Sequence, residues 1–231
     1  MRACPAGSPV KAHAPALANR FPTSGLGRRS KDNCGATEGQ IDNPASHVVS
    51  APLRFGPADV VAKAADAAFG RPLVTNVLRA QLVEAMIALV LEPLWHWCGA
   101  DYAPCDFERA DGLRLEVKQS AARQPWSTDK PSKAIFDVAA RTGRNEAHGW
   151  VEEYGRAAHL YVFAHHPTFD DTADHRDPKQ WHFYIVPTTA LPNVKQIALV
   201  TIKGIVEAVP VSALAEKVAS VASKISNPRA I

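Results

Sequence analysis

Cysteine, long hydrophobic runs and internal repeats are the features that this sequence of 231 residues lacks or has little of. Its four cysteines show no C-x-x-C spacing, which excludes a zinc knuckle or a disulfide framework and indicates a reducing, cytoplasmic location. The longest apolar run near the middle, 85–91, is far shorter than the roughly 20 residues that span a bilayer, so we expect no membrane partner.

The main part of the chain also lacks a net charge that would indicate nucleic-acid binding. Of the 26 basic and 23 acidic side chains, six and three lie within residues 1–50, which leaves 20 of each in residues 51–231. Residues 1–50 are rich in Ala, Pro, Gly and Ser, with Phe21 as the single aromatic residue, and such a segment buries too little apolar surface to offset the entropy of ordering. We therefore predict a disordered N-terminal arm over 1–50 and one folded domain over 51–231.

Hydrophobic patterning in this domain predicts helices first, then strands, then a closing helix. Pro57 and Gly70 frame a first helix, and a second helix, 77–91, follows a Thr-Asn cap and is apolar on almost every side, which predicts burial. A final helix has Ser212 as its expected cap. Short β-branched and aromatic runs predict strands at 94–99, 106–109, 113–120, 134–140, 159–165 and 181–187. This order indicates an α/β or α+β fold with one mixed β-sheet and helices packed on it.

The two charged strands that flank residues 110–112 can be paired in register. If these three residues form the hairpin loop, the glycine at the last position supplies the left-handed conformation that such loops favour. This register sets Phe107 beside Leu115 towards the core and Asp106 beside Glu116 on the other face. A two-residue loop would mix the faces, so burial favours the three-residue loop.

Two carboxylates directly opposite each other repel unless a cation lies between them. Lys118, two residues beyond Glu116, supplies part of that charge. Mg²⁺ would supply it more fully, because it is typically held by one or two carboxylates together with waters and substrate phosphate. Glu84, on the apolar second helix, would be costly to bury without a partner. A site shared by Glu84, Asp106, Glu116 and Lys118 would resolve both costs.

These residues resemble the PD-(D/E)XK nuclease superfamily, which includes many restriction and repair endonucleases. The matching motifs are PCD at 104–106 and EVK at 116–118, behind a helix that carries Glu84. The resemblance covers about residues 75–120 and implies a restriction-endonuclease-like fold, a mixed β-sheet flanked by helices. Cys105 separates the proline from the aspartate, whereas the family motif has them adjacent.

The resemblance also implies roles for the four charged residues. In that family the aspartate and glutamate bind Mg²⁺, with Mn²⁺ as an alternative, which assigns metal binding to Asp106 and Glu116 and accessory metal binding to Glu84. Lys118 would orient or activate the attacking water, and in a partly dry pocket its pKa can fall. Asp111 is a weaker candidate for the acidic position, because it lies in the expected turn.

A Mg²⁺-dependent endonuclease acting on DNA is the function that the resemblance implies, and a homodimer is left open because cutting of both strands often requires two subunits. Local charge agrees with DNA binding: residues 114–144 hold seven basic and three acidic side chains, with Trp126 among them. The alternative is a catalytically inactive nuclease-like domain that binds nucleic acid or a protein partner.

Three other polar features have simpler interpretations. The segment 165–182 holds four histidines and four aspartates, which taken alone would indicate a second metal site or a hydrolase that uses His175. A polar loop between two strands is the preferred interpretation. Asp137 is either a structural hydrogen-bond partner or a border of the charged site. Gln119 is expected to be a buried amide with a hydrogen-bond partner on the opposite face of the sheet.

Overall fold

The computed structural model describes residues 54–99, 103–126, 129–146 and 149–225, which belong to one compact unit. The predicted disordered arm over 1–50 lies outside the described residues. In the part of the chain that is described, no helix is both long and apolar enough to cross a membrane.

The helices follow the sequence pattern closely. They are α1 (Pro57–Phe69), α2 (Asn76–Leu91), α3 (Leu199–Lys203) and α4 (Leu214–Ala222). Pro57 opens α1 and Gly70 follows its end, as predicted. Complete burial of α2 is a wrong prediction: Val77 and Leu89 are 75% and 88% exposed, because only one side of the helix packs on the sheet. Ser212 is not the cap of α4, since a 3-10 turn precedes the helix and Ala213 is its N-cap.

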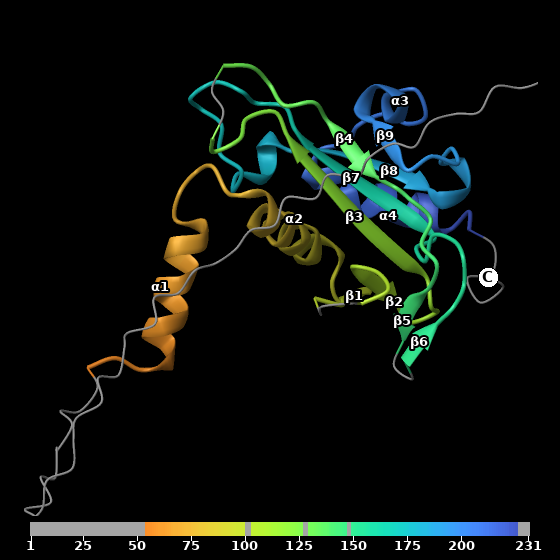
Figure 1. Cartoon of the computed structure of the whole chain (residues 1–231), viewed down its shortest axis with the longest axis horizontal. Coiled ribbons are helices and arrows are strands. Elements are labelled where there is room, and N and C mark those ends of the chain that lie inside the picture. Colours follow the sequence, from red (N-terminus) through yellow and green to blue (C-terminus); the bar gives the residue numbers. More distant parts are fainter. Residues whose placement is uncertain (1–53, 100–102, 127–128, 147–148, 226–231) are drawn as a thin grey trace, which may run out of the picture. The chain divides into compact units, whose positions relative to one another are not determined.

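A five-stranded mixed sheet organises the described residues, as Figure 1 shows. Its strands in spatial order are β1 (Trp95–Trp97), β2 (Phe107–Arg109), β3 (Arg114–Ala121), β7 (Leu160–His166) and β8 (His182–Pro187). β1, β2 and β3 form an antiparallel meander, β3 and β7 are parallel, and β7 and β8 are antiparallel. The predicted mixed sheet with helices is therefore confirmed.

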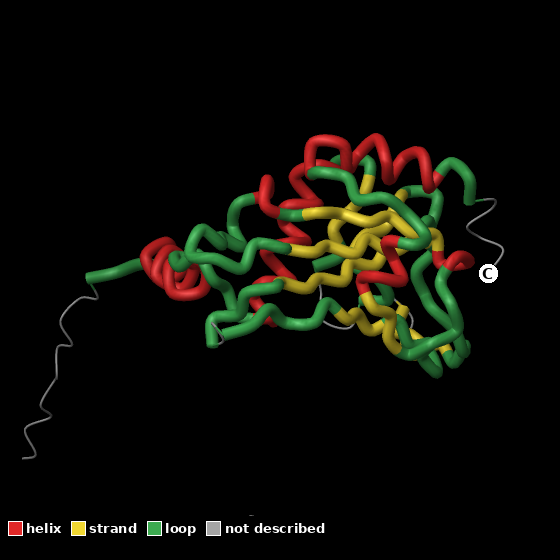
Figure 2. The backbone as a smooth tube through the Cα atoms, turned by 90° about the horizontal axis from the view of Figure 1, so that it is seen from above, coloured by secondary structure: helices red, strands yellow, loops and turns green. Residues whose placement is uncertain are grey.

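The parallel pairing of β3 with β7 requires a crossover, which is made by residues 122–159. Two small two-stranded sheets include strands of this crossover. β4 (Ile135–Asp137) pairs with β9 (Gln196–Ala198), and β5 (Arg144–Glu146) pairs with β6 (Gly149–Val151). In Figure 2 the strands lie side by side with helices running alongside them. The crossover brings residues from the middle of the chain next to β3, which carries the EVK motif.

Two apolar clusters hold the sheet, one on each face. Leu115 and Val117 of β3 belong to the cluster that includes buried residues of α2 and α4. On the other face, Tyr161 and Phe163 of β7 pack with residues of β4, β9 and α3. Because side chains alternate along a strand, β3 presents Glu116 and Lys118, paired in register with Tyr161 and Phe163, on this second face.

Arg79 connects α2 to β3 and is 1% exposed. Its Nε atom donates to Gln119 Oε1 at 2.7 Å, Nη1 donates to Gln124 Oε1 at 3.0 Å, and Nη2 donates to Asn76 Oδ1 at 2.9 Å. The Nη1 atom also donates to the Val74 carbonyl at 3.3 Å. The predicted hydrogen-bond partners of Gln119 are present, but its predicted burial is wrong, because its side chain lies at the edge of the α2–β3 contact and is only partly buried. One buried arginine fixes the helix on the strand.

Candidate active site

The hairpin between β2 and β3 has the predicted register. Phe107 pairs with Leu115, and the N–H of Arg109 donates to the carbonyl of Leu113 at 2.9 Å, which closes a three-residue loop. Gly112 occupies the last loop position with φ of 85°, a conformation that glycine adopts without strain. The loop length that was chosen on grounds of burial is thus confirmed.

Asp106 lies just before β2 and caps the end of this ladder. Its backbone N–H donates to the Leu115 carbonyl at 3.1 Å, so Asp106 does not form a ladder pair with Glu116. Its Oδ2 atom accepts from the N–H of Val117 at 2.6 Å. The Asp106 side chain is therefore fixed against β3 by the N–H of Val117, which lies between Glu116 and Lys118 in the EVK motif.

Glu116 and Lys118 form an ion pair on β3, between Nζ and Oε1. Both side chains are partly buried, with 22% and 29% of their surface exposed. The sequence placed these two residues on one face because they are two positions apart in a strand, and the structure confirms that arrangement. Asp137 of β4 lies close enough to contribute to the electrostatic environment of Lys118.

Glu84 of α2 is held by Trp97, whose Nε1 donates to Oε2 at 3.0 Å. α2 packs on the face of the sheet opposite to Glu116 and Lys118, so Glu84 acts on these two residues over a longer range. Burial raises the pKa of Glu84, the hydrogen bond from Trp97 lowers it, and the Glu116 carboxylate raises it. Glu84 therefore borders the Asp106–Glu116 pair, and its hydrogen bond keeps it directed at Trp97.

Excess negative charge marks the site. Burial, followed by the neighbouring Glu116 carboxylate, raises the pKa of Asp106 to about 7. Burial lowers the pKa of Lys118, but the carboxylates of Glu116, Asp106 and Asp137 raise it, and the net shift is upward. The expectation that the pKa of Lys118 falls is therefore wrong, because the carboxylates around the ammonium outweigh its desolvation.

The carboxylates fit a divalent cation. Asp106 and Glu116 both act on the Lys118 ammonium, and a second cation would relieve the repulsion by Glu116 that contributes to the raised pKa of Asp106. Mg²⁺ needs only one or two protein carboxylates, since water and phosphate complete its coordination. Among the described residues no group of three or more His, Cys, Asp or Glu side chains is placed to hold a metal ion. Asp106 and Glu116 are the two carboxylates that suit a site of the Mg²⁺ type.

The raised pKa of Asp106 leads to a prediction about stability. A carboxyl group whose pKa is about 7 in the folded chain and about 3.9 when unfolded stabilises the fold fully below about pH 4, and this contribution is lost as pH rises through 7. Asp106→Asn keeps an acceptor for the Val117 N–H but cannot ionise. In metal-free buffer the variant should therefore melt a few degrees above the wild type at pH 8 and at the same temperature at pH 4.

Melting curves at both pH values, with Glu207→Gln as an exposed control, provide the measurement. Mg²⁺ at pH 8 should raise the melting temperature of the wild type and leave that of Asp106→Asn unchanged. A wild-type chain that gains stability relative to the variant between pH 4 and pH 8 would contradict the assignment.

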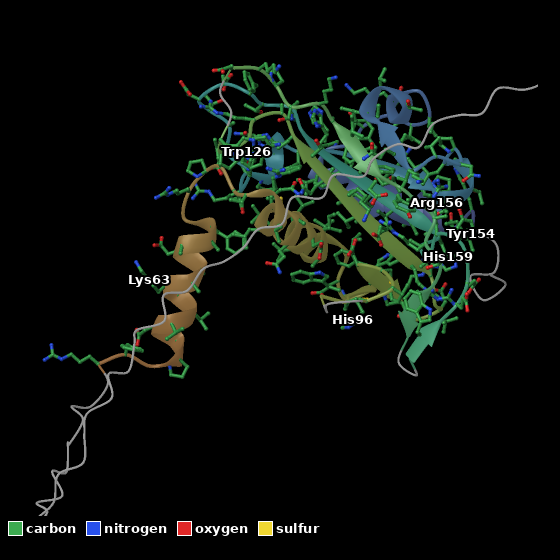
Figure 3. The ribbon with its side chains drawn as sticks, in the orientation of Figure 1. Lys63, His96, Trp126, Tyr154, Arg156 and His159 are labelled. Carbon is green, nitrogen blue, oxygen red and sulfur yellow. The ribbon has the colours of Figure 1, made fainter. Side chains whose placement is uncertain are left out.

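A cavity of about 360 Å³ lies beside the charged strand. Arg114 and Glu116 of β3 line one part of it, Ala103 and Pro104 lie at another part, and His159 and other residues of the crossover line the rest. The other crossover residues are Arg141, Gly143, Arg144, Trp150, Glu153, Tyr154, Gly155, Arg156 and Ala157. Figure 3 shows Tyr154 and Arg156 close to His159 at this end of the sheet, away from Trp126.

The sequence interpretation of the basic segment 114–144 was incomplete. Arg123 pairs with Asp171 and Trp126 does not line the cavity. Arg156, Trp150 and Tyr154 lie beyond that segment and were missed, because nothing in their local sequence sets them apart from an ordinary polar loop. Only the return of the crossover to β7 brings them beside β3.

The remaining candidate residues are engaged elsewhere. Asp111 lies in the hairpin turn, where hydrogen bonding to Arg109 lowers the pKa of Asp111 to about 2. Asp137 accepts from the Ala139 N–H and pairs with Arg141, so its role as a hydrogen-bond partner is confirmed, and it also borders Lys118.

The His/Asp segment 165–182 forms the connection between β7 and β8, as the preferred interpretation predicted. His175 is fully buried: its Nδ1 accepts from the Val74 N–H at 3.0 Å and its Nε2 lies 3.2 Å from the Arg123 carbonyl. The ring also packs near Trp181. A histidine with both ring nitrogens bonded to backbone is not available as a catalytic base, so this segment is structural.

Comparison of the chain with protein-family models, with curated proteins and with solved structures found no match in any of the three. The fold itself is a mixed five-stranded sheet flanked by helices. The class of site is therefore defined by its geometry alone: two clustered carboxylates and a protonated lysine beside a cavity rich in arginine.

Proposed function

We propose that the protein is a Mg²⁺-dependent endonuclease of restriction-endonuclease-like fold that hydrolyses phosphodiester bonds of DNA. The observation that carries the proposal is the β2–β3 hairpin, which fixes Asp106 against β3 beside the Glu116–Lys118 ion pair. The resemblance of the PCD and EVK motifs to the PD-(D/E)XK superfamily supports it, as does the chain order of helix, hairpin and charged strand.

Asp106 and Glu116 would hold the metal ion in this proposal. Glu84 is the accessory ligand and would exchange its hydrogen bond with Trp97 for that role. A bound Mg²⁺ lowers the pKa of coordinated water, polarises the phosphoryl oxygen and neutralises charge in an in-line displacement. Because its pKa is raised, Lys118 stays protonated; it orients the attacking water and stabilises negative charge on the phosphate, rather than removing a proton.

The cavity beside Glu116 supports DNA as the substrate. Four arginines and two glutamates line it, so a phosphate backbone that approaches Glu116 meets an excess of positive charge.

The direct test incubates the full chain with plasmid, linear duplex, single-stranded and branched DNA in the presence of Mg²⁺ or Mn²⁺. We expect strand cleavage that requires the metal and stops in EDTA. If none of these substrates is cut with either ion, the enzymatic proposal is lost. Salt-dependent DNA binding that is insensitive both to Mg²⁺ and to Lys118→Ala would instead identify a nuclease-like domain that binds without cutting.

A further inference from the structure

The cavity beside β3 has a feature that phosphate binding alone does not require: two exposed aromatic side chains in its wall. Trp150 is 59% exposed and Tyr154 is 77% exposed, and both line the cavity together with Glu116. Large aromatic side chains are usually buried on folding, because their transfer from water is favourable. Two exposed aromatic side chains around one cavity offer flat faces on which a partly apolar group can stack.

The indole of Trp150 is supported from within the fold. A methyl group placed on Gly143 would come within 2.6 Å of the Trp150 ring, so the ring lies directly against the backbone of Gly143. Trp150 is in β6, which pairs with β5 so that Arg144 lies opposite Val151. The ring is thus held at the cavity wall by a small hairpin and a glycine, which reduces the entropy cost of stacking a ligand on it.

Fixed positive charge surrounds these aromatic residues. Arg156 donates to the carbonyls of Val138 and Pro192, both at 2.7 Å, and holds the crossover in place. Arg144 pairs with Glu153, and Arg141 pairs with Asp137. These contacts orient the arginine side chains, and a planar guanidinium matches two phosphate oxygens.

The size of the cavity limits what it admits. About 360 Å³ is near the lower end of the roughly 300–1,000 Å³ range of small-molecule sites, which suits one nucleotide and not a stacked base pair. In a duplex both faces of each base are covered by its neighbours, so stacking on an aromatic side chain requires an unpaired or extruded base. Aromatic side chains beside arginines are the combination found in sites for single-stranded nucleic acid.

We propose that this cavity binds one unpaired nucleotide of DNA, with the base stacked on Trp150 or Tyr154 and its phosphate beside Arg114 and Arg141. Since Glu116 lines the same cavity, the substrate has a single-stranded nucleotide next to the bond that is cut. This assignment rests on the proposed nuclease function and narrows its substrate to single-stranded DNA or to the single-stranded part of a branched DNA.

The assignment of an unpaired nucleotide to this cavity is tested by measuring DNA binding and DNA cleavage separately. A fluorescein-labelled 15-nucleotide oligothymidine, a blunt 15-base-pair duplex and a 15-nucleotide oligouridine are titrated with the full chain in EDTA, and anisotropy is recorded. We expect the single-stranded DNA to bind at least tenfold tighter than the duplex. Trp150→Ala and Tyr154→Ala should each weaken oligothymidine binding by about tenfold. Trp150→Phe should retain most of it, because an aromatic face remains.

Trp126→Ala is the matched control, since Trp126 is 70% exposed but does not line the cavity, and it should leave binding unchanged. Equal affinity for duplex and single strand, or wild-type affinity in both cavity variants, overturns the assignment of an unpaired nucleotide. Tighter binding of oligouridine than of oligothymidine overturns its assignment to DNA. Cleavage with Mg²⁺ that shows no preference for single strands refutes this inference alone. Preferential binding of single strands without cleavage supports it and refutes the nuclease proposal.

Discussion

Lys118→Ala should reduce Mg²⁺-dependent DNA cleavage by roughly 100- to 1,000-fold, the loss that follows when one preorganised electrostatic group is removed from an active site. The ammonium pairs with Glu116 on β3 and is surrounded by carboxylates that keep it protonated. Its positive charge is therefore present at any pH at which the enzyme is assayed. Initial rates on plasmid DNA in Mg²⁺ provide the measurement.

Two controls separate a catalytic effect from misfolding. Lys179→Ala removes an exposed lysine from the connection between β7 and β8 and should leave the rate unchanged. Lys118→Arg keeps the charge but presents a wider planar group, so it should recover only a small part of the activity. Circular dichroism should show an intact fold in each variant. Wild-type cleavage by a folded Lys118→Ala chain would remove Lys118 from the mechanism.

Arg79→Ala should destabilise the fold by about 3–5 kcal/mol, because buried acceptors that lose their donor cost about 1–3 kcal/mol each and a cavity adds to this loss. The substitution removes the Arg79 donors from the side-chain oxygens of Gln119 and Gln124, whereas Asn76 Oδ1 still accepts from Gln119 Nε2. It also opens a space between α2 and β3, where Arg79 is 1% exposed. Chemical denaturation followed by circular dichroism measures the free energy of unfolding.

Arg79→Lys should not rescue this loss, because the ammonium has three donors at one point and cannot reach acceptors arranged around a planar fork. Arg71→Ala, at an exposed position just before α2, is the matched control and should change stability by less than about 0.5 kcal/mol. An Arg79→Ala chain as stable as the wild type would show that the buried guanidinium is not needed to fix α2 on the sheet.

Arg79 and Leu89 illustrate what the sequence does not decide about α2. Both lie in a helix that is apolar on almost every side, and helical periodicity alone predicts burial for leucine and exposure for arginine. In the structure Arg79 is buried and Leu89 is 88% exposed. The difference arises because β3 presents Gln119 to one side of the helix, whereas no element of the described chain covers Leu89, and neither fact is encoded within the helix.

The β2–β3 hairpin shows the opposite case. Its register follows from local rules. Phe107 and Leu115 are apolar and pair with each other towards the core, and Gly112 stands where the loop needs a positive φ. A slip by one residue would expose the apolar pair, so burial permits one pairing. For this reason the sequence alone was sufficient to bring Asp106 close to Glu116 and to place Lys118 on the same face as Glu116.

The sequence by itself therefore determined the mixed α/β class, the main strands and the charged hairpin, since each depends on contacts between residues close in the chain. The tertiary structure alone decided the direction of the Lys118 pKa shift, the packing of α2, and with it Glu84, on the other face of the sheet, and the cavity with Trp150 and Tyr154. The cavity depends on the crossover between β3 and β7, which brings Trp150 and Tyr154 beside Glu116, and the position of Glu84 depends on the packing of α2 on the sheet. The burial of each site residue and the charge around it depend on neighbours that are distant in the sequence, and no local sequence pattern specifies these neighbours.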